Sequence, residues 1–265
     1  MRGIHVPKNV QIKPPSLIAH RGYALRYPEN TLESIRAAIE LRAGYVEFDV
    51  QLTADGVPVL LHDSDFWRTG RVDRSVLDMK LEVVRDIWVN ETPRFGPQFG
   101  EVLVPTLDEA IDLVRRYPEV TAFVEVKRES INRFGRNHVL QRVHAALEPA
   151  LSQCVVISFD LDALFESRGR GAHAVGFVLP DWTAATRTAA EGLKPQYIFC
   201  NYRMIPDEDD LWQGPWDWAL YDIIDPDLAL ALTARGARFI ETSAIGDQPP
   251  LRDYSSSRRT TLPQQ

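Results

Sequence analysis

Short apolar runs alternate with amphipathic stretches along most of the chain. Eight of these runs have the length and composition of β-strands: SLIAH, YVEFDV, TAFVEVK, CVVISF, HAVGFVL, YIFC, WALYD and ARFIET. Helix signals lie between several of them, so we expect consecutive strands to pair in parallel through crossover helices. The pattern predicts an α/β fold, a closed (β/α)8 TIM barrel, with an open doubly wound sheet as the alternative.

Capping signals locate the boundaries of three helices. Each helix is expected to begin at a polar capping residue, and two of them are expected to end at a glycine. The boundary residues are Asn30 with Glu33 and Gly44, Thr106 with Glu109, and Asp225 with Pro226 and Gly236.

One connection is too short for a parallel crossover. Only the four residues from Thr53 to Gly56 separate the runs DVQL and VPVLLHD. The turn TADG therefore predicts an antiparallel hairpin that extends beyond the second barrel strand. Folding about this turn places His62 roughly opposite Glu47.

Composition and length fit one soluble domain. The chain has 265 residues, of which 45% are hydrophobic and 25% charged, and its formal net charge is −7. This acidic balance argues against a nucleic-acid partner, and no apolar run reaches the length of a signal peptide or a membrane span. We expect a cytoplasmic protein with buried, reduced Cys154 and Cys200. Its predicted parts are an extended lead-in (1–15), one domain (16–245) and a flexible tail (246–265).

Charged side chains interrupt the predicted strands near their C-terminal ends. Side chains alternate along a strand, so acids two residues apart share one face. In a parallel barrel these ends converge on one rim, and the hairpin would bring a histidine to the same place. The residues concerned are His20 and Arg21 after the first strand, Glu47 and Asp49 in the second, Glu125 and Lys127 in the third, and His62 at the end of the hairpin.

These residue types together favour phosphoester chemistry. Two neighbouring carboxylates are either exposed to solvent or bound to a divalent cation, and convergence on one rim favours the cation. Three acids without a cysteine ligand suit Mg²⁺ or Ca²⁺, and an arginine with a lysine suits a phosphate. Two histidines can act as general base and general acid. The sequence contains neither a Walker A loop nor a GxGxxG motif, so nucleotide transfer is not indicated.

The ordered motifs resemble those of the glycerophosphodiester phosphodiesterase family. The likeness is detailed from about residue 17 to 127 and thins to a strand–helix rhythm up to about residue 243. The motifs are His20-Arg21-Gly22, Pro28-Glu29-Asn30-Thr31, Glu47-Phe48-Asp49-Val50, Thr53-Ala54-Asp55-Gly56, Pro58-Val59-Leu60-Leu61-His62-Asp63, Pro105-Thr106-Leu107 and Glu125-Val126-Lys127.

The resemblance implies a TIM barrel with a small insertion after the second-strand hairpin, at about residues 64–104. It implies hydrolysis of small-molecule glycerophosphodiesters to an alcohol and glycerol 3-phosphate. It also implies one divalent cation, Mg²⁺ or Ca²⁺, and roles for seven side chains. Either histidine can be the base, and either water or the glycerol 2-hydroxyl can attack first. The implied roles are metal binding by Glu47, Asp49 and Glu125, acid–base catalysis by His20 and His62, and phosphate binding by Arg21 and Lys127.

Other residues have less specific predicted roles. Glu29 and Asp63 either orient the site residues or are ordinary acids at a helix start and a turn. Asn30 is expected to be a helix cap rather than a ligand, and Trp218 is a candidate for substrate contact. Two segments depart from the family pattern. Trp218-Ala219-Leu220-Tyr221 stands where Trp-Thr-Val-Asn is common, and Glu241-Thr242 where Thr-Asp is common.

Two other functions remain open at this point. A lysophospholipase D or sphingomyelinase D-like enzyme needs an apolar channel, for which the insertion offers Phe66, Trp67, Ile87, Trp88, Phe95 and Phe99. A non-catalytic barrel that only binds phosphorylated ligands would be expected to have lost a histidine or a metal-binding acid. The sequence makes no prediction about oligomeric state.

Overall fold

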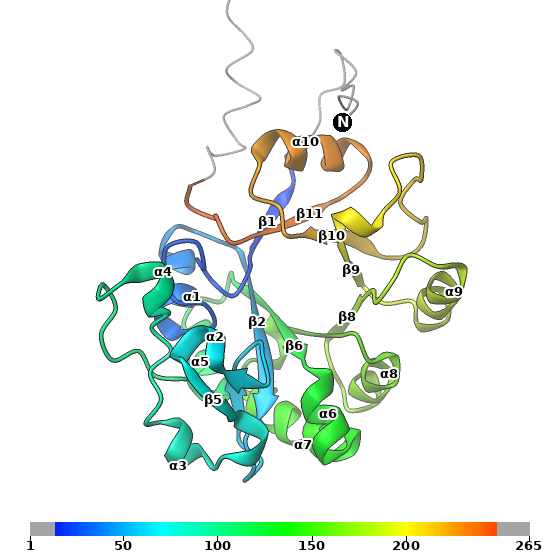
Figure 1. The fold of residues 1–265 in the computed structure, drawn as a ribbon. Coiled ribbons are helices and arrows are strands. Elements are labelled where there is room, and N and C mark those ends of the chain that lie inside the picture. The colour runs from blue at the N-terminus through cyan, green and yellow to red at the C-terminus, as the bar shows by residue number, and fades with distance from the viewer. Residues whose placement is uncertain (1–13, 248–265) are drawn as a thin grey trace, which may run out of the picture.

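The computed structural model describes residues 14–247, which form a closed parallel barrel with helices around it (Figure 1). Each barrel strand pairs with the next in chain order, and β1 pairs with both β2 and β11, which closes the sheet. The TIM-barrel prediction is therefore confirmed, and the open sheet is wrong. The barrel strands are β1 (Ser16–Ala19), β2 (Tyr45–Leu52), β6 (Thr121–Val126), β7 (Cys154–Ser158), β8 (Ala174–Val178), β9 (Tyr197–Asn201), β10 (Asp217–Tyr221) and β11 (Phe239–Thr242).

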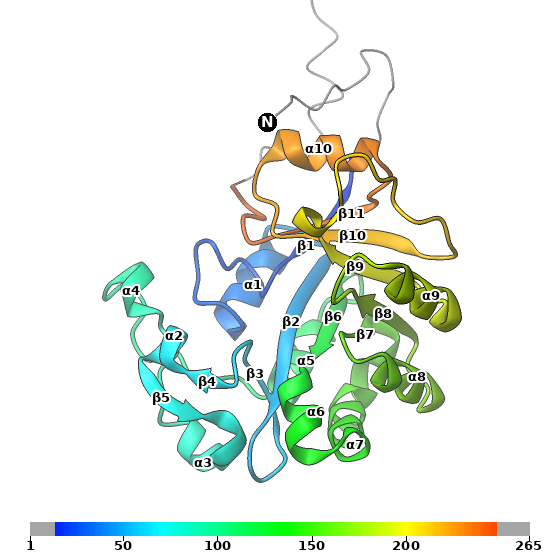
Figure 2. The ribbon, with the colours of Figure 1, turned by 45° about the vertical axis from the view of Figure 1, so that its right-hand side comes forward.

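The larger helices surround the barrel, as Figure 2 shows from a second side. They are α1 (Leu32–Glu40), α5 (Leu107–Val114), α6 (Arg128–Phe134), α7 (Arg136–Leu147), α8 (Leu161–Gly169), α9 (Ala184–Leu193) and α10 (Pro226–Ala234). Within residues 14–247, no helix is both long and apolar enough to cross a bilayer. Except for residues 14, 15, 246 and 247, the predicted lead-in and tail lie outside the described residues.

The strands bury side chains on both faces. One apolar cluster packs the strands against the helices and includes Val46 and Val124. A second cluster consists of residues of the strands and their ends, and in it Phe123 contacts Phe199 with ring centroids 5.1 Å apart. The aromatic side chains of this second cluster fill the barrel interior, which leaves the C-terminal strand ends for polar groups. Cys154 and Cys200 are free and buried, as predicted.

The first helix begins one residue later than predicted. Thr31 is its N-cap and accepts a hydrogen bond from the Ser34 N–H, while the Ser34 side chain accepts one from the Thr31 N–H. Asn30 therefore does not cap the helix. The helix ends before Arg42, which has a left-handed conformation (φ 63°), so Gly44 is not the stop. The caps at Thr106 with Glu109 and at Asp225 with Pro226 are confirmed.

The predicted hairpin is also confirmed. Strand β3 (Pro58–Leu60) pairs antiparallel with β2, and Leu60 lies opposite Val50. Extending that register places position 62 opposite Phe48, one residue from the expected partner Glu47. The difference arises because the turn fixes the register, and the sequence shows the turn only approximately.

The insertion packs on the hairpin (Figure 2). Its apolar residues, among them Phe66, Val76 and Val84, form a separate cluster with Val59 and Leu61 of the hairpin. The chain segment that leads to His62 is thus held by β2 on one side and by the insertion on the other. The insertion comprises β4 (Asp65–Phe66), α2 (Trp67–Gly70), β5 (Val72–Ser75), α3 (Leu81–Val84) and α4 (Thr92–Phe95), with a 3-10 turn at Val76–Asp78.

Gly22 lies where the chain leaves β1 and turns into the following loop, and this turn requires glycine. It has φ 78°, and a Cβ there would lie 2.5 Å from the carbonyl carbon of Ser34. Gly22→Ala should lower the free energy of unfolding by about 2–4 kcal/mol, because a left-handed conformation and a backbone overlap are both penalised. Urea unfolding measures this. Gly44→Ala is the matched control, since nothing lies within 4 Å of its Cβ position. Equal losses in the two variants would contradict the argument.

Candidate active site

Four strand ends bring charged side chains to the C-terminal rim of the barrel. The parallel register places Asp49 of β2 beside Glu125 of β6, and Glu241 of β11 beside Ile18 of β1. His20 follows β1 directly, and its backbone N–H donates to the Thr242 carbonyl. The structure therefore gathers residues that are up to 221 positions apart in the sequence.

Glu47, Asp49 and Glu125 fit a divalent cation. Each offers a carboxylate oxygen, and these atoms lie within 4.8 Å of one another. Glu47 and Asp49 are each 1% exposed, and Glu47 Oε1 is buried with no hydrogen-bond partner among residues 14–247. Burial, together with Asp49 and Glu241, raises the pKa of Glu47 well above its usual value. An all-oxygen donor set of this kind suits Mg²⁺ or Ca²⁺.

Two fixed cations flank these acids. Lys127 Nζ donates to Glu125 Oε1 at 2.7 Å and to Asp49 Oδ1 at 3.2 Å. Arg21 Nε forms an ion pair with Asp49 Oδ2 at 3.1 Å, and the Arg21 backbone N–H donates to Glu47 Oε2 at 3.0 Å. Burial raises the pKa of Asp49, but Lys127 and Arg21 outweigh it and hold that pKa below its usual value. Asp49 is therefore the acid of the group that stays ionised without a metal.

Asn30 holds Asp49 in place. Its Oδ1 accepts from the Asp49 N–H at 3.0 Å, and its Nδ2 donates to Asp49 Oδ2 at 2.9 Å. Asn30 has φ 55°, a left-handed conformation that asparagine tolerates better than most residues. The expected capping role was wrong because Thr31 takes it, which leaves the Asn30 amide for the acid in β2.

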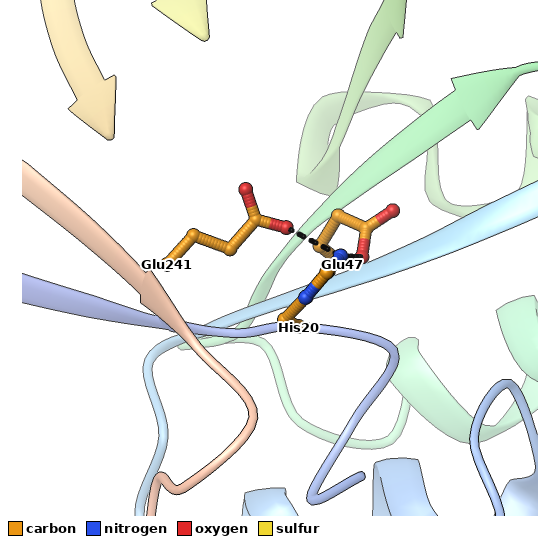
Figure 3. Close-up of side chains that lie close together, drawn as sticks. All are labelled: His20, Glu47 and Glu241. Carbon is orange, nitrogen blue, oxygen red and sulfur yellow. Dashed lines mark ion pairs between the residues drawn. The ribbon is translucent and has the colours of Figure 1, made fainter. Parts of the chain in front are cut away.

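The two histidines have different environments. His20 Nε2 lies 3.6 Å from Glu241 Oε1 and 4.0 Å from Glu47 Oε2 (Figure 3). Burial and the Arg21 charge lower the pKa of His20 to about 3. His62 is more exposed, and its Nδ1 lies 2.7 Å from Asp63 Oδ1. Glu241 was not among the predicted site residues, although it is a charged residue at the end of an apolar strand, like Glu125.

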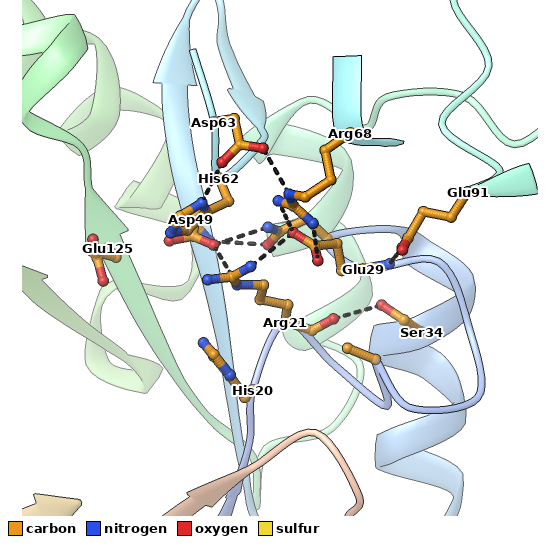
Figure 4. Close-up of polar contacts among 12 residues, drawn as sticks. His20, Arg21, Glu29, Ser34, Asp49, His62, Asp63, Arg68, Glu91 and Glu125 are labelled. Atoms are coloured by element: carbon orange, nitrogen blue, oxygen red, sulfur yellow. Dashed lines mark hydrogen bonds and ion pairs between the residues drawn. The ribbon is translucent and has the colours of Figure 1, made fainter. Parts of the chain in front are cut away.

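Arg68 of the insertion connects the acid beside His62 with the acid beside Arg21. Its Nη1 and Nη2 donate to Glu29 at 2.6 and 2.8 Å, and its Nε donates to Asp63 Oδ2 at 2.8 Å. Glu29 also accepts from Arg21 Nη1 at 2.9 Å. A chain of alternating charges thus runs from His62 through Asp63, Arg68 and Glu29 to Arg21 (Figure 4). Glu29 and Asp63 have the orienting contacts considered for them, whereas no sequence pattern pointed to Arg68.

Trp218 does not lie with these residues. It is 5% exposed, belongs to the cluster between strands and helices, and donates from Nε1 to the Trp212 carbonyl at 3.0 Å. Its ring also packs near that of Trp182, with centroids 5.7 Å apart. Trp218 therefore packs among these other tryptophans, and its contact with a substrate stays a prediction.

The fold and these residues define a class of protein: a TIM barrel with acidic, basic and histidine side chains gathered at its C-terminal rim. The model of the glycerophosphoryl diester phosphodiesterase family matches residues 20–169. The chain is 32% identical over 190 residues to the glycerophosphodiester phosphodiesterase of Caldanaerobacter subterraneus subsp. tengcongensis, covering 69% of this chain and 76% of that one. This chain belongs to the glycerophosphoryl diester phosphodiesterase family.

Other comparisons agree with this assignment. Glycerophosphodiester phosphodiesterase 1 of Bos taurus is 33% identical over 160 residues, which is 60% of this chain and 47% of the relative. The chain thus spans about half the length of the mammalian relatives it matches. A phosphodiesterase of Oleispira antarctica, solved with the product sn-glycerol-3-phosphate, has the same fold. Its TM-score is 0.77 at 23% identity, over 92% of this chain and 97% of that one.

The buried acids predict how stability depends on pH. The pKa values of Glu47 and Glu241 are raised by burial and by neighbouring carboxylates, so both bind protons more tightly when folded. The stability that this proton binding contributes is lost as the pH rises above the unfolded pKa of 4.5. The pKa of His20 is lowered by folding, so its titration makes stability rise with pH. This effect is confined to pH values below its unfolded pKa of 6.5. In chelator, the free energy of unfolding should therefore fall as pH rises through the raised pKa values of Glu47 and Glu241.

Urea unfolding at several pH values, with EDTA or with excess Mg²⁺ or Ca²⁺, checks this expectation. A bound cation should raise stability and remove the fall, since it replaces the proton as the neutralising charge. Glu241→Gln should make the fall smaller, because it removes one of the titrating groups. A free energy of unfolding in EDTA that does not fall with rising pH at any point above 4.5 would contradict the interpretation.

Proposed function

We propose that this chain hydrolyses glycerophosphodiesters to an alcohol and glycerol 3-phosphate with a bound divalent cation. The observation that carries the proposal is the unpartnered Glu47 Oε1, buried beside Asp49 and Glu125 and flanked by fixed cations and two histidines. Family membership supports it, as do the names of the relatives and the product bound to the Oleispira antarctica phosphodiesterase.

Glu47, Asp49 and Glu125 would hold the cation, and Arg21 and Lys127 would bind the phosphoryl oxygens. When bound, the cation supplies Lewis-acid polarisation of a phosphoryl oxygen. Lys127 and Arg21 are held by Asp49 from two sides, so their positive charges are fixed before the substrate arrives. Such preorganised charge stabilises the additional negative charge of a phosphoryl transition state.

The two histidines would exchange protons with the attacking and leaving oxygens. Asp63 accepts from His62 at Nδ1, which leaves Nε2 of that ring to exchange a proton with the substrate. His20 is neutral at pH 7 because of its lowered pKa, so it can accept a proton. Two groups of this kind on one phosphorus centre are what a displacement needs, one for each oxygen.

The lipid-specific alternative has weaker support in the structure. Of the insertion residues that offered an apolar channel, Phe66 and Ile87 are buried in the insertion's own cluster. Trp67 and Trp88 are 55% and 47% exposed. These four side chains therefore do not line one apolar channel. A non-catalytic barrel is not favoured either, because both histidines and all three acids are present at the rim.

Turnover on a panel of substrates tests the function. Glycerophosphocholine and glycerophosphoethanolamine should release glycerol 3-phosphate with Mg²⁺ or Ca²⁺, and dialysis into excess chelator should abolish the release until a cation is restored. Lysophosphatidylcholine is the comparison substrate. A strong preference for the lipid would support the alternative enzyme, and full activity in chelator would overturn the role of the cation.

His62→Ala tests proton transfer. Loss of the imidazole should lower kcat by a factor on the order of 10² to 10⁴, because one oxygen then lacks its acid or base. The fold should persist, since the side chain is 34% exposed. His173→Ala is a control, because His173 is exposed and precedes β8 at the other end of the barrel. Near-normal turnover of His62→Ala would remove His62 from the mechanism.

A further inference from the structure

We propose that His20, Glu47 and Glu241 form a second divalent-cation site beside the first, with Glu47 common to both. The three side chains come from the ends of β1, β2 and β11. Each offers one ligand atom, and these atoms lie within 4.8 Å of one another. Figure 3 shows the carboxylates of Glu47 and Glu241 on two sides of the His20 ring.

The distances fit a shared cation better than direct hydrogen bonds. His20 Nε2 lies 3.6 Å from Glu241 and 4.0 Å from Glu47, which is too far for a hydrogen bond. Two ligand atoms that are each about 2.1 Å from a metal ion lie about 3.4–3.6 Å apart at angles of about 110–120°. A small contraction of the group would therefore complete the coordination of one ion.

Glu241 is only partly neutralised, by the nearby charge of Arg21 and by His20 when that ring is protonated. It is 3% exposed, and nothing in the part of the chain that the structure describes donates a hydrogen bond to its carboxylate. Its one charged contact is His20. A largely buried carboxylate that accepts no hydrogen bond and is aimed at an imidazole has the position of a cation ligand.

The charges around the rim lead to the same conclusion. Six carboxylates and three cationic side chains belong to the connected set, so one divalent cation leaves a net negative charge even before an anionic substrate binds. The second cation compensates for the carboxylate that the first does not reach. The set comprises Glu29, Glu47, Asp49, Asp63, Glu125 and Glu241, with Arg21, Arg68 and Lys127.

The donor atoms define the class of cation. An imidazole nitrogen with two carboxylate oxygens suits borderline ions such as Zn²⁺, Co²⁺ or Mn²⁺, whereas the neighbouring all-oxygen group suits Mg²⁺ or Ca²⁺. The two sites therefore differ in preference. Glu47 can serve both, because Oε2 is on the His20 side and Oε1 has no partner.

Occupation of the second site has a consequence for activity. An ion on His20 Nε2 prevents that nitrogen from exchanging a proton, so it inhibits the hydrolysis. This consequence rests on the proposed function, whereas binding itself does not. The second site would thus make the enzyme sensitive to transition-metal ions at concentrations at which Mg²⁺ or Ca²⁺ activates it.

Co²⁺ is the probe for binding. Equilibrium dialysis of the full chain, with saturating Mg²⁺, should show one equivalent of Co²⁺ that Mg²⁺ does not displace, together with a visible absorption band. Glu241→Gln should weaken this Co²⁺ binding at least about tenfold, because it removes a charged ligand. Asp222→Asn is the matched control: Asp222 lies near the same rim but bonds to Asn201, so binding should persist.

Two results would overturn the proposal: no Co²⁺ retained by the wild-type chain in Mg²⁺, or equal retention by Glu241→Gln. If Glu241→Gln does not fold, as judged by circular dichroism, His20→Gln replaces it and must also lose the ion. Retention by folded His20→Gln would again overturn the proposal.

Inhibition provides the second readout. In Mg²⁺ buffer, Co²⁺ or Zn²⁺ should inhibit turnover of glycerophosphocholine by the wild-type chain, and Glu241→Gln should need at least about tenfold more ion for half-inhibition of its own activity. Equal sensitivity of the two proteins would overturn the inhibitory role. If no glycerophosphodiester is turned over, the proposed function fails, but the dialysis result stands by itself.

Discussion

Repulsion among buried carboxylates is the constraint on which the whole site depends. Asp49 escapes it because Lys127, Arg21 and Asn30 all compensate its charge. Glu47 does not, since one oxygen has only the Arg21 N–H and the other has no partner. The surroundings therefore favour the ionised form of Asp49 and the protonated forms of Glu47 and Glu241, which the proposed cation would allow to ionise. Binding of the proposed cation would thus be coupled to the protonation of these acids and to the stability of the barrel.

The insertion has a structural role in this arrangement because it carries Arg68. The barrel alone would place His62 at the end of a short hairpin, held on one side by β2. Packing of Phe66 against Val59 and Leu61 fixes α2 on that hairpin, and α2 in turn directs Arg68 between Glu29 and Asp63. Packing of apolar side chains in the insertion thus fixes the positions of His62 and Arg68 in the site. The ionic contacts of Arg68 are partly exposed and weak by themselves, so the packing has to supply the rigidity.

The sequence predicted the fold and most of the site because both depend on short-range patterns. Apolar runs of strand length, and a turn of four residues, are local properties that reveal eight parallel strands and one hairpin. Alternation along strands was enough to place Glu47 with Asp49, and Glu125 with Lys127. Asn30 was misassigned because asparagine and threonine cap helices almost equally well, and only the left-handed conformation of Asn30 decides between them. Arg68 and Trp218 depend on tertiary packing, which no pattern of neighbouring residues encodes.

The contact between Glu241 and His20 exists because the barrel closes, and the order of the strands along the chain does not reveal it. Strand β11 pairs with β1, so the last strand lies beside the first and Glu241 faces the histidine that follows β1. Asp49 and Glu125 lie on adjacent strands β2 and β6, and their contacts with Lys127 do not involve β11. A change at the end of β11 can therefore alter the surroundings of His20 while the acids around Lys127 keep their partners. In this chain Glu241-Thr242 stands where Thr-Asp is common, so the acid of the pair lies one position earlier, where it faces His20 and also raises the pKa of Glu47.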